Sequence, residues 1–202
     1  MEKLDRRVRR TRRRLRDALI QLILEKGYDK VIIQEITDTA DLSRATFYLH
    51  YKDKDELLAI SLEEMFDELV DSVKDLMLRR KLELEDDNPP SLPVFKHVAE
   101  YADLYRSLLG DRGVSSVINR TLNYIARIAE QQYLMLIEEG EEANLPVPIE
   151  VASRHLAGAM FSMVSWWLEQ DMPYTPEEMA QMFHVLTVPS IMAAIGHTLK
   201  EN

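Results

Sequence analysis

Between Gly27 and Leu58 the chain carries polar side chains of the kind that bind DNA. Arg44, Thr46, Tyr48 and His50 stand within seven residues of one another. A guanidinium can donate two hydrogen bonds to guanine, and hydroxyl and imidazole groups can bind phosphate oxygens. These four side chains are not needed to fill an apolar core, so we infer a short helix that reads DNA.

The residues around this polar group predict a helix-turn-helix. Ile36 and Ala40 give a first short helix one apolar face, and Phe47 and Tyr51 do the same for the second, one turn apart. Ser43 precedes the second helix as an N-cap, where its hydroxyl can accept a bond from an amide of the first turn. The two short helices are expected at about Gln34–Ala40 and Ser43–Tyr51. The second would be the recognition helix.

The segment resembles the DNA-binding domain of the tetracycline-repressor (TetR/AcrR) family of bacterial transcription factors, in particular a subgroup that includes a dihydroxyacetone-kinase coactivator. The matching residues are Gly27-Tyr28, Gln34-Glu35-Ile36, the run from Ser43 to Tyr51, Lys54, Glu56 and Leu57-Leu58. The resemblance implies base contacts near Gln34, Arg44, Ala45 and Tyr48, and phosphate contacts from Thr46, His50 and Lys54. With Ser43, these residues form the predicted DNA-binding set.

Two departures from the family pattern affect this prediction. Asp41 occupies the turn position where most members have glycine, and aspartate is among the few residues tolerated in a left-handed conformation. Ile32 and Ile33 stand where members usually have threonines. A hydroxyl there would cap the first short helix and touch a phosphate, and isoleucine can do neither.

The composition predicts an all-α protein. The 202 residues include six glycines, eight prolines and no cysteine, and no β-branched alternation marks a strand. The lack of cysteine excludes disulfides and thiolate metal sites, and is typical of the cytoplasm, where we expect the protein. No signal peptide is evident, and the longest apolar run, 156–168, is shorter than the roughly 20 residues of a membrane span.

Charge divides sharply along the chain. Residues 1–54 hold 14 basic and 9 acidic side chains, whereas residues 55–202 hold 11 and 26. A basic head on an acidic body would orient the molecule on DNA. The nine basic residues within 1–16 lead into an amphipathic helix, so we interpret them as a DNA-contacting arm; the alternative is a solvated tail.

The pattern predicts two domains, a DNA-binding domain over 1–53 and an effector-binding and dimerisation domain over 54–202. Residues 54–80 would form a long connecting helix, preceded by a first helix over 9–26 that ends at Gly27. Pro and Asp residues over 83–93 predict a loop. Further helices are expected over 94–109, 114–139, 150–169 and 176–199, the last with a possible kink at Pro189.

The body offers a candidate site for an apolar small molecule. Methionine and aromatic side chains suit adaptable pockets. The alternatives for each residue are core packing or a dimer interface. The predicted effector-pocket residues are Tyr101, Tyr105, Met135, Met160, Phe161 and Trp166.

In similar proteins the last two helices join their symmetry mates in a four-helix bundle, and a twofold partner would cover exposed apolar surface here. An intramolecular core is the alternative. The small and apolar residues expected on these two helices are Ala157, Gly158, Ala159, Ser162, Val185, Ile191, Ala193 and Ala194.

Enzyme chemistry is not predicted, nor is a cofactor or a metal site. The five histidines do not form an H-E-x-x-H pattern, no G-x-S-x-G is present, and the acidic run 138–142 lacks the ligand spacing of a calcium loop. The resemblance implies a homodimeric transcriptional regulator that binds a palindromic operator in double-stranded DNA, usually a repressor, released by an unknown small effector. The alternative is a co-regulator of the same fold whose body binds a protein partner.

Overall fold

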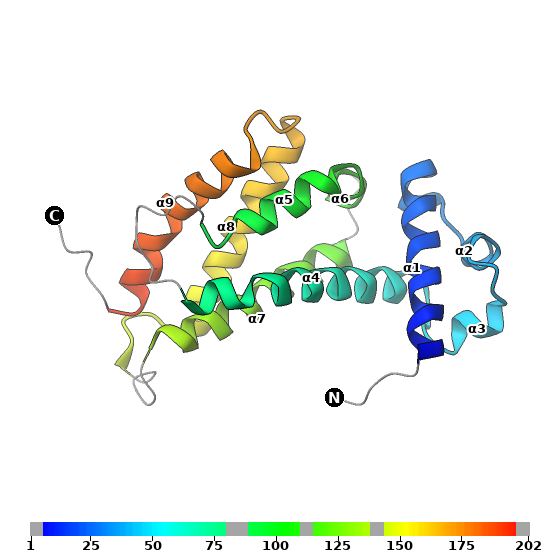
Figure 1. Ribbon diagram of the computed structural model, residues 1–202, viewed down its shortest axis with the longest axis horizontal. Coiled ribbons are helices and arrows are strands. Elements are labelled where there is room, and N and C mark those ends of the chain that lie inside the picture. The colour runs from blue at the N-terminus through cyan, green and yellow to red at the C-terminus, as the bar shows by residue number, and fades with distance from the viewer. Residues whose placement is uncertain (1–5, 80–88, 110–114, 138–143, 197–202) are drawn as a thin grey trace. The chain divides into compact units, whose positions relative to one another are not determined.

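The computed structural model describes residues 6–79, 89–109, 115–137 and 144–196, and every regular element in these ranges is helical, as predicted (Figure 1). The elements are α1 (Arg6–Lys26), the 3-10 turn η1 (Tyr28–Lys30), α2 (Ile33–Thr39), α3 (Arg44–Tyr48), α4 (Lys54–Arg79), α5 (Leu92–Glu100), α6 (Ala102–Leu109), α7 (Ser115–Leu136), α8 (Ile149–Glu169) and α9 (Pro176–Ala194). The start of the predicted arm, most of the predicted loop and the acidic run 138–142 lie outside the described residues.

The chain forms two compact units, the first made of residues 1–65 and 103–118. Within it α1 packs on α2, and α2 on α3 (Figure 1). The side chains of Leu19, Ile36, Phe47 and Leu57 are fully buried there. Within α1 the buried residues Leu15, Leu19 and Leu22 follow helical spacing, so burial of one apolar stripe helps to build this unit.

Glycine is required at the end of α1. Gly27 has φ +81°, a value that costs L side chains energy, and its amide donates to the carbonyl of Ile23 at 2.8 Å. The helix therefore ends where the sequence predicts, and the chain turns at once into η1.

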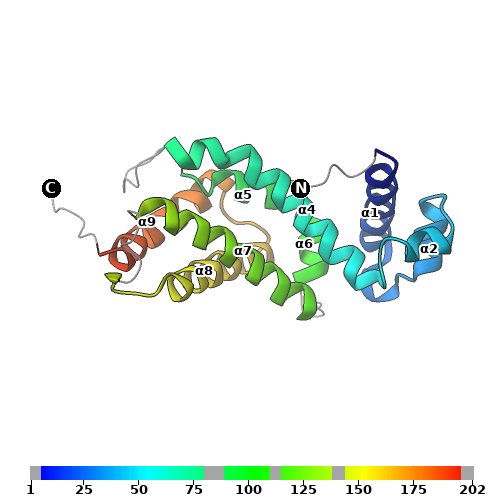
Figure 2. The same ribbon diagram turned by 90° about the horizontal axis from the view of Figure 1, so that it is seen from below.

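The second unit contains residues 66–102 and 119–202. Phe95 of α5 lies edge-on to Trp167 of α8 at 5.7 Å and to Phe183 of α9 at 6.1 Å, measured between ring centroids. Tyr133 of α7 and Ala152 of α8 form a further buried cluster with the end of α9. Helices α8 and α9 thus contribute to both clusters, and Figures 1 and 2 show these two helices side by side.

One predicted helix is two helices in the structure. The sequence predicts continuity over 94–109, but α5 ends at Glu100, Tyr101 is non-helical (φ −110°, ψ 29°), and α6 begins at Ala102. Phe95 and Val98 of α5 are buried and belong to the second unit, whereas the buried Leu104, Tyr105 and Leu108 of α6 belong to the first. Packing into different units, rather than a local glycine or proline, accounts for the break.

Helix α9 begins with a capping box and runs through Pro189. Thr175 Oγ1 accepts from the amide of Glu178 at 3.2 Å, and Glu178 accepts in return from the amide of Thr175 at 2.7 Å. Pro189 lacks the N–H that would bond to the carbonyl of Val185. Val185 is exposed, so water can satisfy that carbonyl.

The sequence predicts a boundary by function between residues 53 and 54. The two units above are instead defined by which residues pack together. Helix α4 contributes residues 54–65 to the first unit and the rest to the second. It belongs to both, as a connecting helix would, and the division by function stays a prediction.

Candidate nucleic-acid interface

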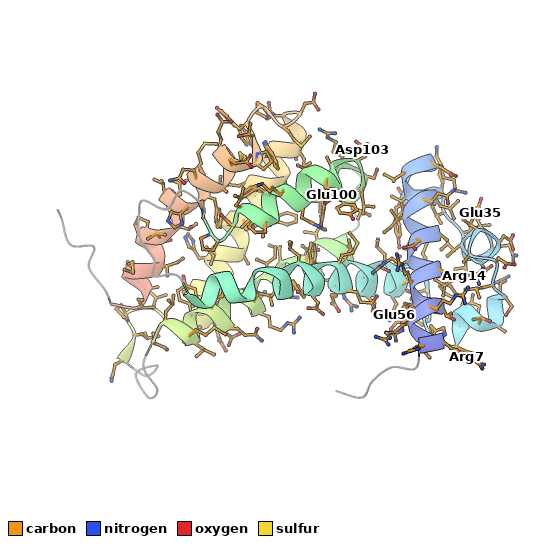
Figure 3. The ribbon with its side chains drawn as sticks, in the orientation of Figure 1. Arg7, Arg14, Glu35, Glu56, Glu100 and Asp103 are labelled. Atoms are coloured by element: carbon orange, nitrogen blue, oxygen red, sulfur yellow. The ribbon has the colours of Figure 1, made fainter. Side chains whose placement is uncertain are left out.

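The turn between α2 and α3 has the geometry of a helix-turn-helix connection. Asp41 adopts φ 50°, and the amide of Leu42 donates to the carbonyl of Thr37 at 2.9 Å. The left-handed aspartate predicted from the sequence is confirmed. Arg14 of α1, labelled in Figure 3, donates to the Asp41 carboxylate at 3.0 Å and to its carbonyl at 3.3 Å. The sequence analysis missed this partner because it lies 27 residues away.

Ser43 caps α3 as predicted. Its Oγ accepts from the amide of Thr46 at 3.1 Å and lies 2.9 Å from the Thr46 hydroxyl. A helix of five residues makes few internal bonds, so this cap and the buried ring of Phe47 fix its position. Phe47 in turn packs on Tyr51, with ring centroids 5.9 Å apart.

The opposite face of α3 is open to solvent. Arg44, Ala45 and Tyr48 are exposed, and the Arg44 guanidinium lies over the Tyr48 ring at 6.0 Å. The Arg44 Nη2 also donates to the Tyr48 hydroxyl at 3.4 Å. These two side chains therefore present donors and an aromatic ring together on one surface.

The remaining predicted DNA-binding residues differ in their surroundings. Gln34 is exposed on α2 and donates to Asp38 at 2.7 Å, whereas Thr46 and His50 are half-buried. Burial lowers the pKa of His50, and the nearby Arg12 lowers it further. Both causes favour the neutral imidazole in the protein without DNA.

Isoleucine at the start of α2 provides no side-chain cap, as the sequence predicts. Ile32 is the N-cap residue and makes no side-chain bond. Its amide instead donates to Glu35 at 3.1 Å, and Glu35 also pairs with Lys26 (Figure 3 labels Glu35). One half of a capping box thus remains, and it ties α2 to the end of α1.

Lys54 binds backbone carbonyls in the structure. Its Nζ donates to the carbonyls of Tyr28 and Val31, both at 3.0 Å, and to that of Asp29 at 3.4 Å. The ammonium also lies 4.4 Å from the centroid of the Tyr28 ring. Lys54 is half-buried, with its ammonium at the end of η1.

The predicted effector-pocket residues divide by exposure. Tyr105 and Met160 are buried and Phe161 is half-buried, while Tyr101, Met135 and Trp166 are exposed. The Trp166 ring stacks at 6.3 Å on Tyr174 in the loop before α9. The effector pocket stays a prediction.

Two residues assigned to an outward face of the last helices are in fact buried. Ala157 is 2% exposed and Ala194 is 5% exposed. Ala194 packs in the cluster with Tyr133 and Ala152, so it contributes to the core of its own chain. Ser162, Val185 and Ala193 are exposed, as predicted, whereas the other residues of that set are half-buried.

Among the described residues, no group of three or more His, Asp or Glu side chains is arranged to hold a metal ion. No helix in the same ranges is long and apolar enough to span a bilayer.

The fold and the exposed face of α3 define the class of a helix-turn-helix transcriptional regulator. Residues 15–59 match the family model described as bacterial regulatory proteins, tetR family, and residues 88–188 match one described as transcriptional regulator C-terminal region. The chain belongs to the TetR family. This family consists of transcriptional regulators rather than enzymes.

Curated relatives share mainly the DNA-binding part. The uncharacterized HTH-type transcriptional regulator YxbF of Bacillus subtilis is 39% identical over 71 residues, covering 35% of this chain and 19% of that protein. The biofilm operon negative regulator IcaR of Staphylococcus epidermidis is 34% identical over 55 residues, covering 27% and 30%. The chain thus spans less than a third of the length of these relatives.

Solved structures share the whole fold. A putative TetR-family regulator from Syntrophomonas wolfei superposes with a TM-score of 0.71 at 18% identity, covering 96% of this chain and all of that one. FadR of Bacillus subtilis in complex with stearoyl-CoA gives 0.57 at 18% identity, covering 88% and 98%. The dihydroxyacetone kinase operon activator DhaS gives 0.59 at 16%, covering 92% and 98%.

Proposed function

We propose that this protein is a homodimeric, sequence-specific DNA-binding repressor whose DNA affinity falls when a small apolar or aromatic effector binds its body. The observation that carries the proposal is the pair Arg44 and Tyr48, exposed together on a capped recognition helix. Family membership supports it, as does the relative IcaR, which is named a negative regulator.

Base reading would come from Arg44, with Gln34, Ala45 and Tyr48 nearby. Two recognition helices of a dimer enter successive major grooves when their half-sites lie about 34–36 Å apart, or a multiple of this, so a palindromic operator is expected. The test is selection of genomic DNA fragments by the purified protein, followed by sequencing and footprinting. Recovery of fragments without a shared palindrome would contradict the proposal.

The dimer would form through α8 and α9. Val151, Trp166, Val185 and Leu186 are large apolar side chains between 45% and 66% exposed on these two helices. This many exposed apolar side chains favours burial against a partner. In a twofold dimer, α8 and α9 of one protomer would pack on α8 and α9 of the other.

The substitution Leu186→Glu tests this interface. Twofold symmetry would place the new charge in the interface twice. The variant should therefore elute with the 23.5 kDa mass of one chain, whereas the wild type should elute with the mass of two chains. Leu24→Glu is the matched control, because Leu24 is exposed on α1 in the other unit. A wild type that is monomeric by light scattering would remove the homodimer.

The effector class rests on the apolar residues of the body and on FadR, which was solved with stearoyl-CoA. Linkage requires that effector and operator weaken each other by one common factor, typically about 1–3 kcal/mol. Trp166 and Trp167 provide an intrinsic fluorescence signal for titrating apolar candidates with and without operator. Equal affinities in both conditions would favour the alternative, a co-regulator whose body binds a protein partner.

A further inference from the structure

The Lys54 ammonium has every hydrogen-bond donor engaged by backbone carbonyls of η1 and of Val31, the residue that follows η1. An ammonium carries three N–H groups. Three carbonyls accept from it, those of Tyr28, Asp29 and Val31, at 3.0 to 3.4 Å. A phosphate oxygen could bind this group only if one of these bonds were given up.

The acceptors are carbonyls at the end of a short helix. The Tyr28 carbonyl also accepts from the amide of Val31 at 3.1 Å, whereas the last carbonyls of a helix generally have no donor within it and need partners from elsewhere. A lysine at a helix C-terminus also interacts favourably with the negative end of the helix dipole. Lys54 therefore caps η1, and it does so from the first residue of α4.

A second bond joins the same two elements from the neighbouring residue. The Tyr28 hydroxyl donates to the carboxylate of Asp55 in the first turn of α4. Tyr28 is 5% exposed, and burial together with this bond raises the pKa of its phenol. The Tyr28 ring lies beneath the Lys54 ammonium, so α4 holds η1 through charge, ring and hydroxyl together.

We propose that Lys54 is a positioning residue that locks η1 to the first turn of α4, instead of the phosphate contact that the family resemblance implies. Only Val31 and Ile32 separate η1 from α2, so the position of this turn sets where α2 begins and where α3 follows. A shift of α4 would then pass directly to the recognition helix. This inference rests on the proposed function, because it assigns the route by which that function is regulated.

The salt dependence of operator binding separates a lock from a phosphate contact. A protein that binds one phosphate fewer has a slope of log affinity against log salt that is flatter by about 0.9. Lys54→Met should instead weaken binding at all salt concentrations, by roughly tenfold, the order expected for a bond to a charged group. Its slope should match that of Lys52→Met, which removes an equal charge from an exposed site two residues away.

The variant Lys54→Arg should bind the operator well if Lys54 contacts a phosphate, and weakly if Lys54 positions η1. Lys54→Arg keeps the charge and would restore a phosphate contact, but a planar guanidinium cannot direct three donors at these three carbonyls. We therefore expect Lys54→Arg to bind as weakly as Lys54→Met. A flattened slope in Lys54→Met together with rescue by arginine would overturn the lock.

A measurement without DNA tests the lock independently of the proposed function. In hydrogen exchange, the segment 27–35 of Lys54→Met should exchange faster than in the wild type, while α1 residues 15–26 keep their protection. Tyr28→Phe, which removes the hydroxyl but keeps the ring, should show a smaller change in the same segment. Unchanged exchange in both variants would refute the lock, whereas failure of the wild type to select any operator would refute the proposed function alone.

Discussion

At the turn before α3, an aspartate takes a conformation that most residues avoid, and an arginine of α1 holds it there. A left-handed conformation costs an L residue roughly 1–2 kcal/mol, less for aspartate, which can bond locally. Arg14 binds both the carboxylate and the carbonyl of Asp41. The pair offers a structural reason why this chain can manage without the glycine usual in its family.

Substitutions of Asp41 separate the contribution of the ion pair with Arg14 from the cost of the left-handed backbone. Asp41→Ala loses the ion pair and keeps the strained φ, so it should lower the free energy of unfolding by about 1 kcal/mol. Asp41→Gly loses the same pair but removes the strain, and should be close to neutral. Urea unfolding midpoints measure both, and an Ala variant as stable as the wild type would show that the turn is not strained.

Arg44 carries the prediction about base readout. Arg44→Ala should cost about 1–3 kcal/mol on the selected operator and relax the preference at one base position. Binding to unrelated DNA should weaken much less. An equal loss on both DNAs, measured by fluorescence anisotropy at fixed salt, would mean that Arg44 contacts phosphate.

At the scale of elements, two helices begin with a side-chain cap. Helix α3 has one side-chain cap, from Ser43, and α9 has a full capping box at Thr175. Both caps serve an N-terminus, but α3 lies in the first unit and α9 in the second. The two caps therefore allow stability and DNA binding to be separated.

Removing each cap should destabilise the protein to a similar extent but affect DNA differently. Ser43→Ala and Thr175→Ala should each cost about 0.5–2 kcal/mol, and Ser43→Gly only a few tenths. Under conditions where every variant is folded by circular dichroism, only Ser43→Ala should weaken operator binding. Equal operator affinity for Ser43→Ala and the wild type would show that α3 needs no cap to read DNA.

At the scale of the whole molecule, the division of charge predicts how the protein approaches DNA. Residues 1–54 carry a net charge of +5 and residues 55–202 one of −15. The acidic body should be repelled by phosphates, which leaves the basic end to make first contact. Arg6, Arg7, Arg9 and Arg10 are exposed on the first turns of α1.

Deletion of residues 1–8 tests the contribution of the basic arm. It removes Lys3, Arg6 and Arg7, so binding should weaken and the salt slope should flatten by about 0.9 for each phosphate that the shortened chain no longer binds. The oligomeric state, checked by light scattering, should not change. If the slope of log affinity against log salt equals that of the full chain, residues 1–8 do not bind phosphate and form a solvated tail.

The sequence by itself determined the features that depend on neighbours along the chain. The spacing of Ile36, Phe47 and Tyr51 predicted which faces are buried, and Ser43 predicted the start of α3, because helical periodicity and capping act over three or four residues. Gly27 likewise marked the end of α1 through its backbone conformation alone.

Only the tertiary structure decided the contacts between residues far apart in the chain. Lys54 meets carbonyls 23 to 26 residues away, and Arg14 meets Asp41 at a separation of 27. Local periodicity carries no information about such pairs, and it could not show that α5 and α6 belong to different units or that Ala157 and Ala194 face their own core. The physical reason is that an apolar or charged side chain can be satisfied by any complementary partner, and only the folded chain selects which one it meets.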